Sequence, residues 1–352
     1  MTSLHVVVPE GIDDPARRSG GNLYDRRVCD GLVALGWQVH EHALPGAWPS
    51  LTAAARAPLA TLLAGLDDGW MVLLDGLIAC ATPDLLVPQA ARLHIAVIVH
   101  LPLGAPADAP AEAGEWERAV LSAAAAVVTT SDWTRRWLLA RYGLHGHRVH
   151  VAEPGVDPAP QAVGTDGGGQ LLCVAAVAPH KGQDLLLAAL RSIRDLPWRC
   201  ICVGSTTRAP EFAVEVARTA EHAGLADRFV LAGHRSGAAL DASYARADVL
   251  VLPSRIETYG LVITEALVRG LPVIAADVGG VPQALGDDGT GRRPGLLVPA
   301  DDVPALAGGL RRWLDEPDLR HRLRDSARQR RATLRRWEST ATVVSDVLAR
   351  HR

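Results

Sequence analysis

The sequence contains no uninterrupted run of about 18 apolar residues, the length that a membrane-spanning helix needs. Its first ten residues, MTSLHVVVPE, lack the basic start and long apolar stretch of a signal peptide and are typical of a strand. The formal net charge of -3 gives no reason to expect binding to nucleic acid or to an anionic membrane. Together these absences favour a cytoplasmic location.

Cysteine and aromatic residues are also scarce. Aromatic side chains make up only 4% of the chain, so Leu, Val and Ala must fill the interior. The cysteines are odd in number, lie mostly inside apolar runs and show no close metal-ligand spacing. We therefore expect reduced, buried thiols rather than disulfides or zinc ligands. They are Cys29, Cys80, Cys173, Cys200 and Cys202.

Lysine is rarer still, because Lys181 is the only lysine among the 36 basic residues. Arginine does every other cationic task, as a bias in base composition would produce. Lys181 lies in the segment PHKGQ, just before a predicted helix. A compact ammonium group in that position can neutralise a phosphate, so we expect a chemical role for it.

The length of 352 residues fits two domains, and a hydrophobic content of 48% is enough for two cores. Apolar strands alternate with amphipathic helices in two rounds, which predicts mostly parallel sheets covered on both faces. In the first round we expect strands at 4–10, 37–44, 70–77, 92–100 and 124–131, and helices at 25–36 and 133–143. In the second we expect strands at 171–177, 198–204, 228–233, 248–254 and 272–277, and helices at 184–193, 211–224, 239–247 and 261–270.

A linker rich in proline and glycine, residues 151–170, separates the two rounds. We therefore expect Rossmann-like domains at 1–155 and 156–334, with a helix at about 335–352 that packs back on the first. The arginine-rich tail, residues 319–337, is typical of a solvated helix with a narrow stripe formed by Leu319, Leu323 and Leu334. A membrane-surface helix is the alternative for this tail, and the rest of the sequence gives it little support.

Two glutamates mark the predicted ligand site. Glu257 follows a buried strand, and Glu265 lies eight residues later in the helix that Gly260 opens. On one helix they would be roughly 12 Å apart, too far to share a proton or to act on one bond. Carboxylates accept hydrogen bonds in pairs, so each is suited to a diol of ribose or hexose. An ordinary pair of surface glutamates is the alternative interpretation.

Glycine-marked loops at neighbouring strand ends complete this site. Lys181 is followed by Gly182, and the turn Gly279–Pro282 follows the next strand. Ligands of open α/β sheets bind outside the carboxyl ends of the strands, so these loops should converge. Exposed amide groups at the helix start of Gly260 suit an anion such as a diphosphate.

These residues resemble a known family. The run from Glu257 to Glu265 resembles the E-x7-E motif of retaining glycosyltransferases of family 4, which have the two-domain GT-B fold. The segments VAPHKGQDLLLAAL, GLPVIAADVGGVPQAL, GLLVPADDVPALAGGL and SGGNLYDRR resemble further landmarks of that family. The resemblance implies two Rossmann-like domains facing each other across a cleft, with the acceptor side in the first and the nucleotide-sugar donor in the second.

The resemblance also implies roles for individual residues. Lys181 should bind the donor diphosphate, Glu265 the ribose, and Glu257 the transferred sugar near the reacting carbon. His100 matches a first-domain histidine near the reaction centre, although taken alone it would be structural. The remaining expected donor contacts are Gly20, Gly21, Thr258, Tyr259, Gly260, Leu261, Gly204, Gly233 and His234. Expected acceptor contacts are Asn22, Asp75 and the loops 10–18 and 75–83.

The sequence departs from the family pattern at two positions. Ala176 stands where the family usually carries an arginine in the strand leading to the lysine. Our hypothesis is that Arg255 supplies the missing phosphate contact. Gln283 stands where an acidic residue is common after the GGVP turn, which bears on donor or acceptor choice.

The predicted reaction transfers a hexosyl group from a UDP- or GDP-linked donor to an acceptor hydroxyl, with retention of configuration. No Asp-x-Asp motif follows a strand near the donor landmarks, so the interpretation requires no metal and no cofactor. A nucleotide-sugar epimerase and a catalytically silent nucleotide-sugar-binding protein are the alternatives. A nicotinamide dehydrogenase is disfavoured, because the first strand is not followed by G-x-G-x-x-G. A pyridoxal-dependent phosphorylase that uses Lys181 would show a visible absorption band.

Overall fold

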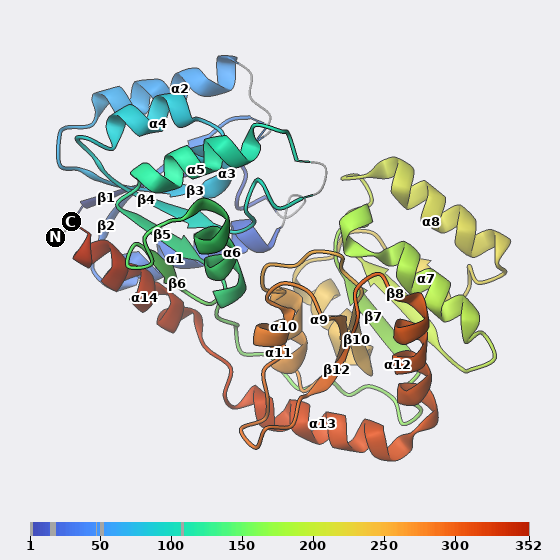
Figure 1. Cartoon of the computed structure of the whole chain (residues 1–352). Coiled ribbons are helices and arrows are strands. Elements are labelled where there is room, and N and C mark those ends of the chain that lie inside the picture. The colour runs from blue at the N-terminus through green and yellow to red at the C-terminus, as the bar shows by residue number, and fades with distance from the viewer. Residues whose placement is uncertain (1–2, 15–18, 47, 50–52, 107–108, 352) are drawn as a thin grey trace. The chain divides into compact units, whose positions relative to one another are not determined.

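The computed structural model describes residues 3–14, 19–46, 48–49, 53–106 and 109–351. Residues 15–18 of the expected acceptor loop 10–18 lie outside the described residues. The chain divides into two compact units, residues 1–155 with 335–352, and residues 156–334 (Figure 1).

The first unit is built on a six-stranded sheet in which all strand pairs are parallel. The strand order is β2-β1-β3-β4-β5-β6, so the direction of winding reverses between β1 and β3. The strands are β1 (Ser3–Pro9), β2 (Gln38–Leu44), β3 (Met71–Asp75), β4 (His94–Val99), β5 (Ala126–Thr129) and β6 (Val149–Val151). The helices are α1 (Gly20–Ala34), α2 (Ala53–Gly65), α3 (Gly76–Ala79), α4 (Pro83–Gln89), α5 (Ala113–Ala123), α6 (Asp132–Tyr142) and α14 (Trp337–Arg350).

Helix α14 belongs to the first unit and packs along α1, as Figure 1 also shows. The close approach depends on a glycine in α1, since a Cβ atom on Gly31 would lie 2.3 Å from the Cβ of Ala341. Trp37, just beyond α1, donates its indole hydrogen to the Ser345 hydroxyl at 2.9 Å. The last helix thus completes the core of the unit that holds the start of the chain.

The second unit carries a six-stranded parallel sheet in the order β12-β11-β10-β7-β8-β9. Winding reverses between β7 and β10, which is the arrangement of a Rossmann sheet. The strands are β7 (Gln170–Val174), β8 (Arg199–Val203), β9 (Phe229–Leu231), β10 (Val249–Leu252), β11 (Val273–Ala276) and β12 (Gly295–Val298). The helices are η2 (Pro179–Lys181), α7 (Gln183–Ser192), α8 (Pro210–His222), α9 (Gly237–Arg246), α10 (Leu261–Leu267), α11 (Val281–Leu285), α12 (Val303–Asp315) and α13 (Pro317–Arg331).

The side chains of β10, a central strand of this unit, point alternately into two hydrophobic cores. Val249 and Val251 of β10 join the cluster formed with α7, α8 and α12, whereas Leu250 and Leu252 join the cluster formed with α9, α10 and α11. Successive side chains of a strand point to opposite faces, so a continuous apolar run serves a sheet that is covered on both sides. This confirms the α/β class expected from the apolar strands.

Three local features differ from the expectations. Helix α1 begins at Gly20 rather than near Asp25, because the Ser19 hydroxyl accepts the amide hydrogen of Asn22 and caps the helix. Strand β6 runs up to Val151, where the linker was expected to begin. The helix of the tail, α13, ends at Arg331 rather than near Trp337, where α14, the helix expected at about 335–352, begins. Leu319 and Leu323 are buried in the core of the second unit, so the apolar stripe is a packing surface.

All five cysteines are buried and free, as expected. Burial raises the pKa of the Cys29 thiol to about 12. Among the described residues, every helix is too short or too polar to cross a membrane.

Histidines cluster on the strands β1 and β2. The Nδ1 of His5 lies 2.9 Å from the Nε2 of His42, and the ring of His5 stacks on that of His40 with centroids 5.0 Å apart. Burial lowers the pKa of His5, and the nearby His42 and His40 lower it further. Burial and the charge of His40 likewise lower the pKa of His42, and Glu41 opposes this. The folded first unit therefore favours the neutral form of the His5 and His42 rings.

This cluster predicts that acid destabilises the first unit. A histidine whose folded pKa is depressed binds fewer protons in the native state, so stability is lost as pH falls below the unfolded value of about 6.5. We expect the melting temperature to drop between pH 7 and pH 5 in a calorimetric series. His42→Gln should reduce that drop, whereas His321→Gln, at an exposed site on α13, should leave it unchanged. An identical pH dependence in His42→Gln would contradict the prediction.

Candidate functional site

The loops on either side of the switch point in the second unit bring Lys181 and Glu257 together. Lys181 ends η2 after β7, and Glu257 lies in the loop after β10. The Lys181 Nζ is 2.7 Å from the Glu257 Oε2, and both side chains are largely buried, with 22% and 15% exposed. Because β7 and β10 are adjacent strands, their carboxyl ends present these side chains to the same place. The sequence prediction that the lysine and this glutamate converge is met.

Glycines allow the three loops to approach each other closely. Gly182 has a φ of +72°, and a Cβ there would lie 2.2 Å from the carbonyl oxygen of Pro253. Gly279 has a φ of +55°, and a Cβ there would lie 1.8 Å from the Glu257 carbonyl oxygen. The amide of Gly280 donates to that same oxygen at 3.0 Å. The turn after β11 therefore supports the backbone that carries Glu257.

Glu265 occupies a different environment from Glu257. It lies in α10, where its Oε2 accepts a hydrogen bond from the Tyr244 hydroxyl at 2.8 Å. Arg269 packs its guanidinium over the Tyr244 ring at 4.5 Å and donates to the backbone carbonyl of Glu265 at 2.8 Å. Glu257 instead contacts Lys181. The two carboxylates thus have separate partners, in accordance with the spacing argument.

Between the two glutamates, the backbone turns into α10. Gly260 is the N-cap of α10 with a φ of +94°, and Leu261 begins the helix. Tyr259 is buried at 5% exposure, whereas Thr258 is partly exposed. Helix α10 has only seven residues, so its amides are a minor electrostatic feature beside the charge of Lys181.

Arg255 does not fit the hypothesis that it binds phosphate. Its guanidinium donates to both carboxylate oxygens of Asp184 at 2.9 and 2.7 Å, and its Nε donates to Asp301 at 2.7 Å. Two carboxylates therefore balance the charge of Arg255. The side chain links the loop after β10 to Asp184 of α7 and to Asp301. This pairing speaks against Arg255 as the replacement for the arginine absent at Ala176.

The loop around Ala176 is shaped by a buried amide instead. Gln183 is fully buried, donates to the Ala176 carbonyl at 3.0 Å and accepts the amide hydrogen of Ala178 at 3.4 Å. Nearby, a Cβ on Gly204 would lie 1.8 Å from the Ala175 carbonyl oxygen. The Gly204 amide donates to Gly233 at 2.9 Å, which brings two of the expected donor contacts together. His234, the next residue, is exposed.

The first unit gathers three other site residues. His100 follows β4, and its Nε2 lies 2.8 Å from the Asp25 Oδ1 and 3.7 Å from the Asp75 Oδ2. Gly21 lies against the imidazole ring, since a Cβ there would be 3.1 Å from its Cδ2. Tyr24 meets the same ring edge to face, with centroids 5.2 Å apart. Asp75 also caps α3 by accepting the amide hydrogen of Leu77 at 2.6 Å.

Strong mutual interactions shift the protonation of this group. Burial lowers the pKa of His100, but the charge of Asp25, its hydrogen bond and the charge of Asp75 outweigh burial and raise it to about 9. Burial and the charge of Asp25 raise the pKa of Asp75 to about 8, against the opposing effect of His100. One ligand atom from each of Asp25, Asp75 and His100 lies within 4.8 Å of the others. This is the only group of the described residues whose spacing suits a metal ion.

Several residues around these sites were not predicted. Asp25 and Tyr244 are the main partners of His100 and Glu265, and the buried Glu117 accepts amide hydrogens of Leu103 and Gly104, at 2.9 and 3.2 Å, in the loop after His100. Asp25 is four residues beyond Gly21 and so shares its helix face, which is the one signal available from sequence. The partners of Glu117 and Tyr244 lie on other elements and leave no local pattern.

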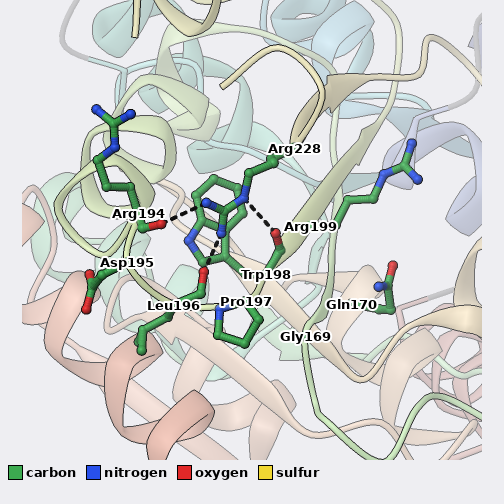
Figure 2. A pocket seen from close by; sticks show the side chains of 9 residues that line it. All are labelled: Gly169, Gln170, Arg194, Asp195, Leu196, Pro197, Trp198, Arg199 and Arg228. Atoms are coloured by element: carbon green, nitrogen blue, oxygen red, sulfur yellow. Dashed lines mark hydrogen bonds between the residues drawn. The ribbon is translucent and has the colours of Figure 1, made fainter. Parts of the chain in front are cut away.

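A shallow hollow of about 450 Å³ lies elsewhere on the second unit (Figure 2). Gln170 and Arg199, the first residues of β7 and β8, are among its lining residues, so it opens at the amino ends of these strands. Arg228 stacks 3.9 Å over the Trp198 ring and donates to the carbonyls of Arg194, Leu196 and Trp198. The Arg228 guanidinium thus holds the backbone of residues 194–198 in place. The hollow lies at the opposite end of the strands from Lys181.

Two family models match the chain. The model "Glycosyltransferase Family 4" covers residues 19–160, and the model "Glycosyl transferases group 1" covers residues 160–330. D-inositol 3-phosphate glycosyltransferase of Kineococcus radiotolerans is 34% identical, over 75% of this chain and 66% of that protein. The enzyme of that name from Jonesia denitrificans is 33% identical, over 76% of this chain and 67% of its own length. The chain thus spans about two thirds of the length of these relatives.

Solved structures share the fold over the whole chain. Sucrose-phosphate synthase from Thermosynechococcus elongatus has a TM-score of 0.80 at 22% identity, covering 99% of both chains. HepE of Anabaena, in complex with UDP and glucose, has a TM-score of 0.79 at 15% identity, covering 99% of this chain and 100% of its own. The chain belongs to glycosyltransferase family 4 and has the GT-B fold.

Proposed function

We propose that the protein transfers a hexosyl group from a UDP- or GDP-linked sugar to an acceptor hydroxyl, with retention of configuration and without a metal. The observation that carries the proposal is the ion pair of Lys181 and Glu257 at the switch point of the second sheet. Breaking a glycosyl–phosphate bond leaves negative charge on the diphosphate and positive charge on the sugar. A cation and a carboxylate 2.7 Å apart match this separation of charge.

Lys181 acts on the leaving group in this proposal. A donor diphosphate would replace Glu257 as the partner of the ammonium group, and the ammonium would stabilise the charge that develops on the phosphate. The carboxylate released from the ion pair would then accept hydrogen bonds from sugar hydroxyls. Glu265, held by Tyr244, would bind the ribose diol.

The first unit contributes His100, Gly20 and Gly21 to the proposed reaction. Gly21 lies against the imidazole ring, since a Cβ there would be 3.1 Å from its Cδ2, and the donor phosphates would approach the backbone of Gly20 and Gly21 beside it. In a retaining transfer the acceptor hydroxyl attacks from the face that the leaving group departs. The departing phosphate then takes the proton of the acceptor hydroxyl.

The acceptor and the place of action are part of the proposal. The names of the relatives make a phosphorylated cyclitol the first acceptor class to test. Asn22 and the loops 10–14 and 76–83 are the proposed contacts for it. The Asp75 carboxylate, expected from the sequence as a contact, is only 3% exposed and caps α3, so it is not among them. We propose that the protein acts in the cytoplasm.

A donor screen tests the function directly. Thermal-shift measurements with UDP- and GDP-hexoses should identify the donor, because a ligand that binds only the folded state raises the melting temperature. Turnover with that donor and inositol 3-phosphate or other polyol acceptors should then persist after exhaustive chelation. Restoration of turnover only by manganese would contradict the metal-free mechanism. Conversion of the donor to an isomer without an acceptor would favour an epimerase.

Glu257→Ala is expected to lower kcat by about tenfold to a hundredfold while donor affinity changes by about threefold or less. The reason is that its contacts with sugar hydroxyls gain strength as charge develops on the sugar, whereas the nucleotide contacts persist. Steady-state kinetics measures kcat, and calorimetric titration with the donor measures its affinity. Glu221→Ala, at an exposed site on α8, is the matched control and should alter neither. Equal losses in kcat and in donor affinity would restrict Glu257 to binding.

A further inference from the structure

Asp25, Asp75 and His100 converge from three elements of the first unit. Asp25 lies on α1, Asp75 ends β3, and His100 follows β4. β3 pairs with both β1 and β4, and the sheet reverses its winding between β1 and β3, so the group lies at a switch point. The two carboxylates are 2% and 3% exposed, whereas the imidazole is 15% exposed. The ring is therefore the part of the group that a ligand can reach.

The surroundings cannot stabilise two negative charges. The cavity that both carboxylates line is otherwise formed by apolar side chains and Cys29, and it has no room for a water molecule. The Asp25 Oδ2 is buried and has no hydrogen-bond partner among the described residues. A buried carboxylate oxygen without a partner is costly, and two adjacent carboxylates in such a place do not both ionise.

A single proton between the two carboxylates would both give the Asp25 Oδ2 a hydrogen-bond donor and remove one of the two negative charges. The Asp75 Oδ1 already accepts the Leu77 amide hydrogen at 2.6 Å, so the Asp75 Oδ2 is the atom that can carry a proton toward Asp25. Burial and the charge of Asp25 raise the pKa of Asp75 to about 8, which agrees with a protonated Asp75 at neutral pH.

We propose that Asp25 and Asp75 share a single proton, and that this singly charged pair positions His100 as a cation that faces the donor. Only the statement that His100 faces a sugar donor rests on the proposed function, whereas the shared proton does not. Asp25 holds the Nε2 of the ring at 2.8 Å, while Gly21 and Tyr24 bound the ring on other sides. The Nδ1 has no hydrogen-bond partner among the described residues. It is thus available to donate to an anionic or hydroxyl group of the substrate.

The net charge of the group is then zero, with one carboxylate balancing one imidazolium. In spite of burial, the charge of Asp25 and the hydrogen bond to it raise the pKa of His100. Tyr24, Cys29 and Cys80 are further ionisable side chains that interact with the two carboxylates. Burial raises the pKa of all three, so they stay neutral. Because the three groups interact strongly, a rise in pH removes the shared proton and the cation in coupled steps.

A divalent metal is the competing occupant of these three side chains. Ions that favour carboxylate and imidazole ligands also take further ligands, usually water. The cavity beneath the carboxylates admits no water, so a proton fits where a hydrated ion does not.

Vibrational spectroscopy of the intact protein tests the shared proton. At pH 7 the infrared difference spectrum of wild type minus Asp75→Asn should contain the carbonyl stretch of a protonated carboxylic acid, which should disappear as pH rises through about 8. Asp30→Asn, at an exposed site on the same helix as Asp25, is the control and should retain the band. The absence of a protonated carboxyl at pH 7 would overturn the proposal. Stoichiometric binding of Mn²⁺ or Zn²⁺, lost in Asp75→Asn, would also overturn it in favour of a metal site.

Nuclear magnetic resonance of the His100 ring tests the positioning role. The ring nitrogen signals, assigned with His100→Gln, should stay those of an imidazolium up to about pH 8 in the wild type. In the double variant Asp25→Asn/Asp75→Asn the ring should titrate at or below its usual pH, and an unchanged titration would overturn the role of the pair. Asp25→Asn should lower kcat by about tenfold with donor KM nearly unchanged. If no donor is turned over, the spectra still decide on the shared proton, so the two proposals fail separately.

Discussion

Replacing Lys181 with alanine should lower the transfer rate by about a hundredfold or more, because the leaving diphosphate loses its one lysine cation. The same change leaves the Glu257 carboxylate without the partner 2.7 Å away. Lys181→Arg keeps the charge but spreads it over a planar group, so it should recover only part of the activity. Arg191→Ala, at an exposed site in the last turn of α7, removes another cation of the second unit and should leave the rate unchanged. Near-normal turnover of Lys181→Ala would exclude the lysine from catalysis.

Chemical modification offers an independent test, since Lys181 is the only lysine of the chain. Amine-selective reagents can react only there and at the N-terminal amine. Acetylation removes the charge and should abolish turnover, whereas reductive methylation keeps the charge and should preserve part of it. A bound donor should protect the site from acetylation. Full activity of protein acetylated at Lys181 would contradict the proposed role.

Replacing Gly279 with alanine should destabilise the second unit by about 3 kcal/mol and abolish donor binding. The added Cβ would lie 1.8 Å from the Glu257 carbonyl oxygen, and the φ of +55° is itself unfavourable for alanine. The backbone of the Glu257 loop must therefore shift. Since backbone atoms are in contact, no side-chain rotation can relieve the overlap.

Gly289→Ala is the matched control for this prediction. Gly289 has a φ of +86°, but a Cβ there would meet no atom within 4 Å. It should cost only the backbone strain, about 1 kcal/mol, with donor binding intact. Thermal unfolding and calorimetric titration measure both effects. If the two variants behave alike, the contact between the Gly279 turn and the Glu257 loop is unimportant.

Sequence reasoning was most successful for the strands of the second unit. The apolar run before Glu257 alternates between two cores, which follows directly from the period of a strand. It was less successful where a single side chain determines the first residue of a helix. The cap formed by Ser19 places Gly20 inside α1, although the helix had been expected to begin near Asp25.

Arg255 illustrates what local sequence cannot decide. A cation two residues before Glu257 was a reasonable candidate for a phosphate contact. Its actual partners, Asp184 and Asp301, are 71 and 46 positions away in the chain. No periodic pattern encodes contacts between loops of that separation.

By itself, the sequence determined the α/β class, the family motifs and the choice of Lys181, Glu257 and Glu265, because strand period and glycine-marked loops are local properties. Only the tertiary structure showed that Asp25 and Asp75 meet at His100, that Tyr244 holds Glu265, and that Arg255 is already neutralised. These facts depend on distances of a few ångströms between side chains that come from different strands and helices. The close packing of the whole sheet sets such distances.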